Sequence, residues 1–493
     1  MITKKGQTLL MKQTVLYGSL AVVLLLCLTA CQPLIVDPRG QGAGVITAAQ
    51  PTATEATAGA AGLGDPLYPQ LGNGGYDVQH YTIELAVDMT NSAITGTTTI
   101  TALATAALSS FNLDLLGLDV DHVTVNEAPA TFTHNGQELT ITPATALTAD
   151  QPFSVTVAYG GVPEPVSDPG VPFEAVGWLD YDTEGIYVLS EPSGAMSWYP
   201  VNNHPLDKAT YTFRITAPEP YVVAANGLLV DEIAEGAWRT YVWEVRDPMV
   251  SYLATVNIAE FDVIREEGPA GLPIINFFPP ARSRWLQRDF APTAAMITYY
   301  SELIGPFPFE SYGAIVMDVP FGGALETQTR PVFGSTATME MIVAHELAHQ
   351  WFGNSVSLTS WQDIWLNEGF ATYLHHLWTE HTKGKTVFNA TLRGMYTTMK
   401  LRQMPPPGKP DLSGIFDGSV YTRGAWTLHA LRLEVGDDTF FQILRTYYVR
   451  YQNSNATTAD FIAIAEEVSG QALDDLFQAW LYGEAVPDVA GME

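Results

Sequence analysis

Two histidines four residues apart enclose an acidic residue in the stretch Val343–Gly369, which reads VAHELAHQWFGN and later NEG. Residues four apart in a helix lie on the same face, so His345 and His349 can aim ring nitrogens at one ion. Glu346 leaves the same helix about 100° further round. It can therefore reach a water molecule at that ion without being a ligand. This pattern indicates metal-assisted hydrolysis.

A third ligand is needed, because catalytic zinc keeps three protein ligands and one open position. Glu368 follows His349 by 19 residues and can supply it. We therefore predict one zinc ion held by His345, His349 and Glu368. The alternative is a surface helix with two incidental histidines. By composition alone, the pattern His-Glu-x-x-His arises in roughly one such chain in a hundred.

Two helices must position these side chains. Apolar residues at helical spacing predict a first helix around 338–352, and Gly353-Asn354 is a plausible stop. The stretch Trp361–Glu380 predicts a second helix that returns alongside the first and brings Glu368 to the ion. His375 and His376 lie near its end, and we interpret them as surface or packing residues.

The rest of the chain divides into two compositional parts. From 66 to 264, apolar and polar residues alternate as in strands, and Asn135-Gly136 between two such runs predicts a hairpin. From 265 to 493, strand-like runs are followed by several helical ones. We therefore predict an α+β multidomain fold, with an N-terminal β-sandwich-like domain over 66–264 and a mixed α/β domain over 265–493 that contains the site.

The amino terminus resembles a bacterial lipoprotein signal. Lys4, Lys5 and Lys12 precede the apolar run Val15–Leu28, and a small residue stands before Cys31. We expect cleavage after residue 30, lipidation of Cys31 and a location outside the cytoplasm, on a bacterial membrane. The alternatives are an ordinary signal peptide or an uncleaved anchor. Residues 31–65 are rich in Ala, Thr, Gly and Pro, which predicts a flexible tether.

The net charge limits the partners. It is -30, and loss of residues 1–30, with three lysines and no acid, would leave 20 basic against 53 acidic residues, near -33. Such acidity argues against nucleic acid and against a polybasic membrane contact. Of the two cysteines, Cys27 lies in the predicted signal, so we expect no disulfide in the mature protein.

Several motifs together resemble the M1 family of zinc aminopeptidases, gluzincins related to aminopeptidase N. The resemblance runs from about Tyr76 to the end of the chain. Gly323-Ala324-Leu325-Glu326-Thr327 is similar to the family's Gly-x-Met-Glu-Asn motif, and Tyr421-Thr422-Arg423-Gly424 to its Tyr-x-Lys-Gly motif. The resemblance implies a thermolysin-like catalytic domain and, since the sequence ends soon after Pro487, a short form without the large helical C-terminal domain of many relatives.

The resemblance also implies roles for individual residues. Glu346 would act as general base and acid for an attacking water that the zinc activates, and Tyr421 would stabilise the oxyanion. Glu326 would bind the free α-ammonium group of a peptide, and the backbone of Gly323 and Ala324 would lie along the peptide.

Three points remain open in this assignment. Glu191 stands near the family's second amine-binding position, although it can equally be a loop carboxylate. Thr327 replaces the motif's Asn, which puts the fine positioning of the peptide in doubt, and Arg423 replaces the usual Lys without an evident role.

Two other functions compete with an aminopeptidase. One is a zinc hydrolase of another kind, either an endopeptidase or a relative of leukotriene hydrolase; Glu326 argues against the endopeptidase. The other is a catalytically silent surface binding protein that has kept the fold. The presence of His345, Glu346, His349, Glu368 and Tyr421 together argues against a silent protein.

Overall fold

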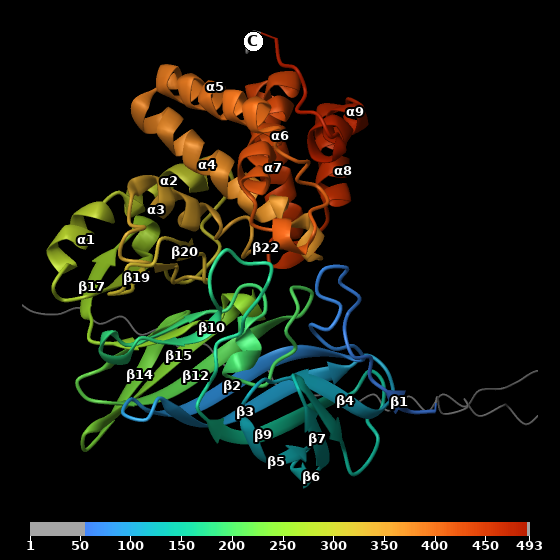
Figure 1. Ribbon diagram of the computed structural model, residues 1–493, viewed down its shortest axis with the longest axis vertical. Helices are drawn as coiled ribbons and strands as arrows, with labels where there is room; N and C mark the ends of the chain where they lie inside the picture. The colour runs from blue at the N-terminus through green and yellow to red at the C-terminus, as the bar shows by residue number, and fades with distance from the viewer. Residues whose placement is uncertain (1–54, 491–493) are drawn as a thin grey trace, which may run out of the picture. The chain divides into compact units, whose positions relative to one another are not determined.

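The computed structural model describes residues 55–490, which form one compact unit (Figure 1). Its first half is built from β-sheets and its second half mostly from helices. The largest sheet has eight strands in the order β14-β15-β12-β2-β3-β9-β5-β6, and two four-stranded sheets accompany it, β1-β4-β8-β7 and β10-β11-β16-β13. Buried and more exposed residues alternate along β2 and β12, as expected for strands with one face on a core.

The bounds of these strands are as follows. They are β1 (Thr57–Ala58), β2 (Tyr76–Asp88), β3 (Ala93–Ala104), β4 (Leu108–Asp114), β5 (Asp119–Val125), β6 (Ala128–Pro129), β7 (Thr131–Asn135), β8 (Glu138–Thr142), β9 (Pro152–Gly161), β10 (Gly177–Asp180), β11 (Ile186–Leu189), β12 (Lys208–Pro218), β13 (Val222–Ala225), β14 (Leu228–Glu235), β15 (Trp238–Val250) and β16 (Val256–Ala259). Short 3-10 helices interrupt them at Asp182–Glu184, Gly194–Ser197 and Ser251–Leu253.

A five-stranded sheet, β17-β18-β19-β21-β20, opens the second half, and a two-stranded sheet joins β22 to β23. Their bounds are β17 (Asp262–Glu267), β18 (Pro273–Phe278), β19 (Ile315–Val316), β20 (Ala324–Leu325), β21 (Val332–Phe333), β22 (Val356–Leu358) and β23 (Ser454–Ala456). Because β20 is the last strand of its sheet, one of its edges is free to pair with another extended chain.

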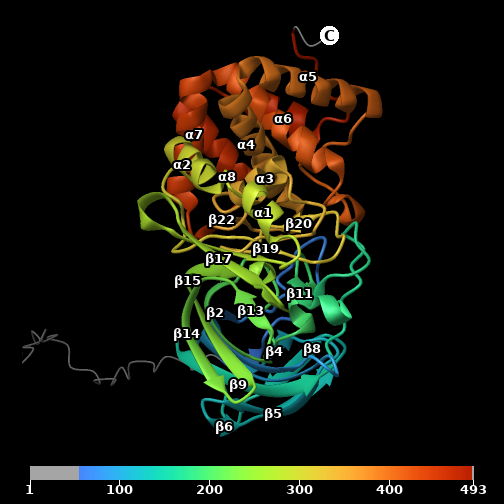
Figure 2. The same ribbon diagram turned by 90° about the vertical axis from the view of Figure 1, so that its left-hand side faces the viewer.

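The helices of the second half lie on one side of the β-rich half in both views (Figures 1 and 2). They are α1 (Ser283–Asp289), α2 (Thr293–Leu303), α3 (Glu340–Ala348), α4 (Trp365–Lys383), α5 (Lys385–Arg402), α6 (Gly418–Val435), α7 (Asp437–Tyr451), α8 (Thr458–Ser469) and α9 (Asp474–Phe477), followed by a π-turn at Gln478–Tyr482. Further 3-10 turns are Pro269–Gly271, Trp361–Asp363 and Leu412–Gly414.

Helix α4 is the centre of this half. Every residue of its stretch Trp365–Trp378 is buried, and α3, α5 and α6 all pack against it. A helix that is buried all round lies inside a core rather than on its surface. The functional side chains that α4 contributes are therefore held on a rigid element.

The α+β fold class and the hairpin at Asn135-Gly136 are confirmed, since β7 and β8 pair across it. The tether predicted over 31–65 is wrong for its last residues: β1 pairs with β4, and the Gly74 amide donates to the Ala60 carbonyl. Backbone pairing of these residues fixes a segment whose composition looked like linker. The predicted signal segment 1–30 and Cys31 lie outside the described residues. Among residues 55–490, no helix is long and apolar enough to span a bilayer.

Candidate metal centre and substrate pocket

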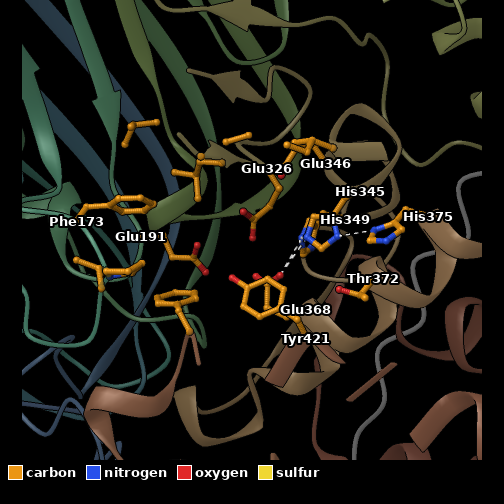
Figure 3. Close-up of a pocket in the computed structure, with 18 of the residues that line it drawn as sticks. Phe173, Glu191, Glu326, His345, Glu346, His349, Glu368, Thr372, His375 and Tyr421 are labelled. Atoms are coloured by element: carbon orange, nitrogen blue, oxygen red, sulfur yellow. Dashed lines mark hydrogen bonds and ion pairs between the residues drawn. The ribbon is translucent and has the colours of Figure 1, made fainter. Parts of the chain in front are cut away.

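The three predicted metal ligands converge (Figure 3). His345 Nε2 lies 3.1 Å from His349 Nε2 and 3.2 Å from Glu368 Oε2, and His349 Nε2 lies 3.5 Å from the same oxygen. Ligand atoms of a tetrahedral zinc ion, with bonds of about 2.0 to 2.2 Å, lie roughly 3.3 to 3.6 Å apart. Two imidazoles and one carboxylate are also a donor set of catalytic zinc. The residues present therefore fit the ion.

The end of α3 sets the position of His349. The helix stops at Ala348 rather than at 352 as predicted, and His349 is its C-cap residue with a helical backbone. His345 and His349 thus keep their common face, although the chain turns away directly afterwards. Gly353 permits this turn: its φ is +126°, and a β-carbon there would lie 3.0 Å from His349 Nδ1.

A close approach of α4 and α6 brings Glu368 and Tyr421 into the same pocket. A β-carbon on Gly369 would lie 2.9 Å from the carbonyl carbon of Gly424, so neither position has room for a larger residue. Tyr421 is the fourth residue of α6, and its ring is roughly parallel to that of His345 with centroids 6.1 Å apart. Its hydroxyl thus belongs to the pocket that contains the metal ligands.

That pocket has a volume of about 460 Å³, and both Glu326 and Glu191 line it. Each of these carboxylates has one oxygen, Oε1, buried without a hydrogen-bond partner. With Glu346 and Glu368, they make four buried acidic groups around one space. Burial and the neighbouring carboxylates raise the pKa of Glu191, Glu326 and Glu346. Buried carboxylates need compensating positive charge, so the pocket is suited to cations.

The backbone of Glu326 is held by the segment that follows α3. Asn354 Nδ2 donates to the Glu326 carbonyl at 2.7 Å and Gln350 Nε2 at 3.2 Å, while Gln350 Oε1 accepts the Thr329 amide. The segment that follows α3 and the Gly323–Thr327 motif are therefore connected directly. Sequence reasoning did not assign this role to Gln350 and Asn354, although they adjoin His349 in one motif. Gly323 and Ala324 line the pocket, and Ala324 belongs to β20, the last strand of its sheet.

Of the two interpretations of His375 and His376, as surface or as packing residues, burial supports packing, but neither anticipated that both line the pocket. Both lie within α4, are 8% and 7% exposed, and line the pocket. His375 Nδ1 lies 3.2 Å from His345 Nδ1, and burial lowers the pKa of His376 to about 4. The signal was present in the sequence, because His375 follows Glu368 by seven residues, which is two helical turns on the same face.

Comparison with known proteins is consistent with this geometry. Residues 324–480 match the family profile described as "Peptidase family M1 domain", and residues 77–253 match "Peptidase M1 N-terminal domain". A solved M1 zinc metallopeptidase from Deinococcus radiodurans is 31% identical, with a TM-score of 0.79 over 87% of this chain and 98% of that one. The chain belongs to peptidase family M1. This M1 chain is also similar to a mutant of the Deinococcus protein bound to a Tyr-Ser-Ala substrate, with 30% identity and a TM-score of 0.80 over 88% of this chain and 100% of that one.

Curated relatives of this M1 chain are longer. It is 26% identical to human glutamyl aminopeptidase over 359 residues, which are 62% of this chain and 36% of that protein. It is 25% identical to aminopeptidase M1-A of Oryza sativa subsp. japonica over 452 residues, which are 83% of this chain and 51% of that protein. The M1 chain thus spans about a third to a half of the length of these curated relatives.

Proposed function

We propose that this M1 peptidase is a zinc-dependent aminopeptidase that removes the N-terminal residue from peptides. One observation supports this most directly: a three-residue zinc ligand set, a non-ligating glutamate and two unpartnered buried carboxylates face one pocket. The ligand set fits hydrolysis, and the two carboxylates fit a substrate with a free amino group. A Tyr-Ser-Ala substrate on the Deinococcus relative supports peptides as the substrate class.

The chemistry divides among the zinc site, Glu346 and Tyr421. One zinc ion on His345, His349 and Glu368 would supply Lewis-acid polarisation of the scissile carbonyl and of water. Glu346 takes a proton from the attacking water as its oxygen bonds to the carbonyl carbon. It then gives that proton to the peptide nitrogen as the carbon–nitrogen bond breaks. Tyr421 donates a hydrogen bond to the carbonyl oxygen, where negative charge develops in the transition state.

Recognition of the free amino terminus rests on Glu326 and Glu191. Two carboxylates beside the reaction centre attract an ammonium group and also set the register, because that group is separated from the scissile carbon by only one atom. The free edge of β20 would pair with the extended peptide through the backbone of Gly323 and Ala324. Cleavage would therefore fall after the first residue.

A panel of aminoacyl fluorogenic amides, with and without a chelator, tests this function. We expect turnover that the chelator abolishes and that zinc restores, and no turnover of N-acetylated versions of the same amides. Equal cleavage of acetylated and free substrates would favour the endopeptidase. A Glu346→Gln variant should keep its zinc and lose turnover, whereas turnover like the parent's would refute Glu346 as the base. A protein that binds zinc but cleaves nothing in the panel would favour the silent binding protein.

We also infer, from the sequence alone, that the mature protein is anchored to a bacterial membrane through lipidated Cys31 and faces away from the cytoplasm. The support is the basic start, the apolar run and the small residue before Cys31. Expression in a bacterial host with labelled palmitate should label the parent, and Cys31→Ser should abolish the label. An unlabelled parent in the soluble fraction would contradict the anchor.

A further inference from the structure

The two histidine ligands of the metal centre have different partners on their outer nitrogens. His349 Nδ1 lies 3.3 Å from the carbonyl oxygen of Phe352, an ordinary acceptor for a ligating histidine. His345 Nδ1 instead lies 3.2 Å from another imidazole nitrogen, His375 Nδ1 (Figure 3). The outer nitrogen of His349 therefore has a backbone carbonyl as its partner. The outer nitrogen of His345 has a side chain as its partner, and a substitution can remove that side chain.

The contact continues to a third imidazole. His375 Nε2 lies 3.2 Å from His376 Nε2, so the three rings form a chain that leads away from the metal centre. His375 and His376 are almost fully buried in α4. A hydrogen bond between two imidazole nitrogens joins one nitrogen that bears a proton to one that does not.

Only one arrangement of protons satisfies this chain while His345 is a ligand. His345 must keep its Nε2 lone pair for the ion, so its proton is on Nδ1. His375 must then accept at Nδ1 and has its proton on Nε2. His376 accepts that proton's hydrogen bond at Nε2 and has its own proton on Nδ1. The geometry therefore assigns a tautomer to all three rings.

We propose that His375 is a positioning residue for the metal centre, which accepts the Nδ1–H of His345 and so fixes the tautomer and ring orientation that ligation requires. His376 supports it by fixing the tautomer of His375. This inference rests on the proposed zinc site, and it concerns a residue that the catalytic assignment does not use. Partners of this kind commonly change metal affinity by about 10- to 100-fold.

A matched pair of substitutions tests whether the acceptor nitrogen of His375, Nδ1, affects zinc binding. His375→Asn and His375→Leu place side chains of similar size and shape at the same position, but only Asn offers an oxygen near the place of Nδ1. We expect His375→Leu to weaken zinc binding by about 10- to 100-fold and His375→Asn to stay within about threefold of the parent. The dissociation constant is measured by competition with a chromophoric chelator, independently of activity. His381→Leu on the same helix is the control, since His381 is exposed and stacks on Tyr299.

The melting temperature of the metal-free proteins shows whether His375 positions His345 or only contributes to packing. A positioning role predicts similar melting of the two metal-free 375 variants and different zinc affinities. Equal zinc affinities of the Asn and Leu variants would overturn the proposal, whether both match the parent or both are weakened. A parent protein that binds no zinc would instead overturn the proposed function itself.

A measurement on the parent needs no substitution. Nitrogen-15 NMR of histidine-labelled, zinc-loaded protein distinguishes the two neutral tautomers and the doubly protonated ring. We expect protons on Nδ1 of His345, Nε2 of His375 and Nδ1 of His376. A doubly protonated His375, or one with its proton on Nδ1, would contradict the proposal even if both 375 variants failed to fold.

Discussion

Glu191 and Glu326 come from different halves of the fold, yet with Glu368 their carboxylate oxygens lie within 4.8 Å of one another. Glu191 follows β11 in the β-rich half, and Glu326 follows β20 at the edge of the five-stranded sheet. Each has one buried oxygen without a hydrogen-bond partner. Two buried carboxylates so close together carry both charges only where positive charge lies near them, and otherwise take up a proton. In the proposed function, the ammonium group of the substrate supplies that positive charge.

Removal of one of these charges should lower kcat/KM for substrates with a free amine. For Glu326→Gln, which keeps the shape of the side chain, we expect kcat/KM to fall by roughly two orders of magnitude, about 3 kcal/mol, because a buried ammonium loses its countercharge. Glu191→Gln should show a loss of the same kind. Steady-state kinetics on one aminoacyl amide measures both, with the exposed Glu266→Gln as control. Parent-like kinetics of Glu326→Gln would exclude it as the amine-binding group.

Tyr421→Phe removes only a hydroxyl from a pocket whose walls stay in place. If that hydroxyl donates to the developing oxyanion, kcat should fall by roughly 100- to 1,000-fold while KM changes little. Zinc content should stay at the parent level, because Tyr421 is not among the converging ligands. A higher KM with unchanged kcat would indicate that Tyr421 binds substrate in the ground state and has no role in the transition state.

We expect the side of the pocket beyond Glu191 to select the first residue of the substrate. In Figure 3, Phe173 lies on that side, away from His345, and its ring contacts that of Phe321 with centroids 4.5 Å apart. The first side chain of a peptide branches from the atom that bears the ammonium, so we expect it to reach the apolar residues near Glu191, which include Phe173 and Phe321. We expect Phe173→Ser to reduce kcat/KM for Phe and Leu amides by about 3- to 10-fold and for the Ala amide much less.

Trp238→Ser, which removes an equally exposed aromatic ring from β15, is the control for Phe173→Ser. An equal loss for Phe, Leu and Ala amides would mean that Phe173 does not select the first residue but acts on folding or on the reaction itself.

The two histidine ligands could be predicted from the sequence because their spacing is local. His345 and His349 are one helical turn apart, and that relation survived even though α3 ends at Ala348. The contact of Gln350 and Asn354 with Glu326 could not be predicted in the same way. It depends on how the chain turns after the helix, and Gly353 makes that turn possible at a positive φ.

The structure gives Arg423 a role that its motif does not indicate. Its guanidinium is buried and donates to the carbonyls of Trp480 and Met404, and further hydrogen bonds reach the carbonyls of Ala479, Gly483 and Ala485. A planar guanidinium with five donors can bind that many acceptors, whereas an ammonium has three. The role is thus to hold the end of the helical half onto α6. It depends on a distant segment, so the sequence around Tyr421 could not reveal it.

The tether was mispredicted at its end because small residues and glycine resemble linker wherever they occur. Asp65 shows what binds this segment to the fold. Its Oδ1 accepts the amides of Leu67 and Tyr68, and its Oδ2 accepts the Ser360 hydroxyl and the Trp361 amide just before α4. One carboxylate thereby joins the start of the described chain to the helical half.

These contacts make stability depend on pH. Burial by itself raises the pKa of Asp65, but the contact with His204 and the amides of Trp361, Tyr68 and Leu67 outweigh it and lower the pKa to about 2. The unfolded value is near 3.8, so the folded state binds the proton less tightly than the unfolded state. The stabilisation is therefore complete above about pH 5 and declines as the pH falls toward 2.

We expect Asp65→Asn to lower the stability at pH 7 by about 1 to 2 kcal/mol, since the carboxylate charge that the pKa-lowering contacts stabilise is lost. The difference from the parent should shrink as the pH falls from 5 to 3, because the carboxylate of the unfolded parent, with a pKa near 3.8, takes up a proton there while that of the folded parent, with a pKa of about 2, stays mostly charged. Thermal melting of the metal-free proteins measures this without a contribution from zinc release. The exposed Asp262→Asn is the control and should melt like the parent at each pH. A difference that stays constant from pH 7 to pH 3 would show that the carboxylate charge is not what holds this segment.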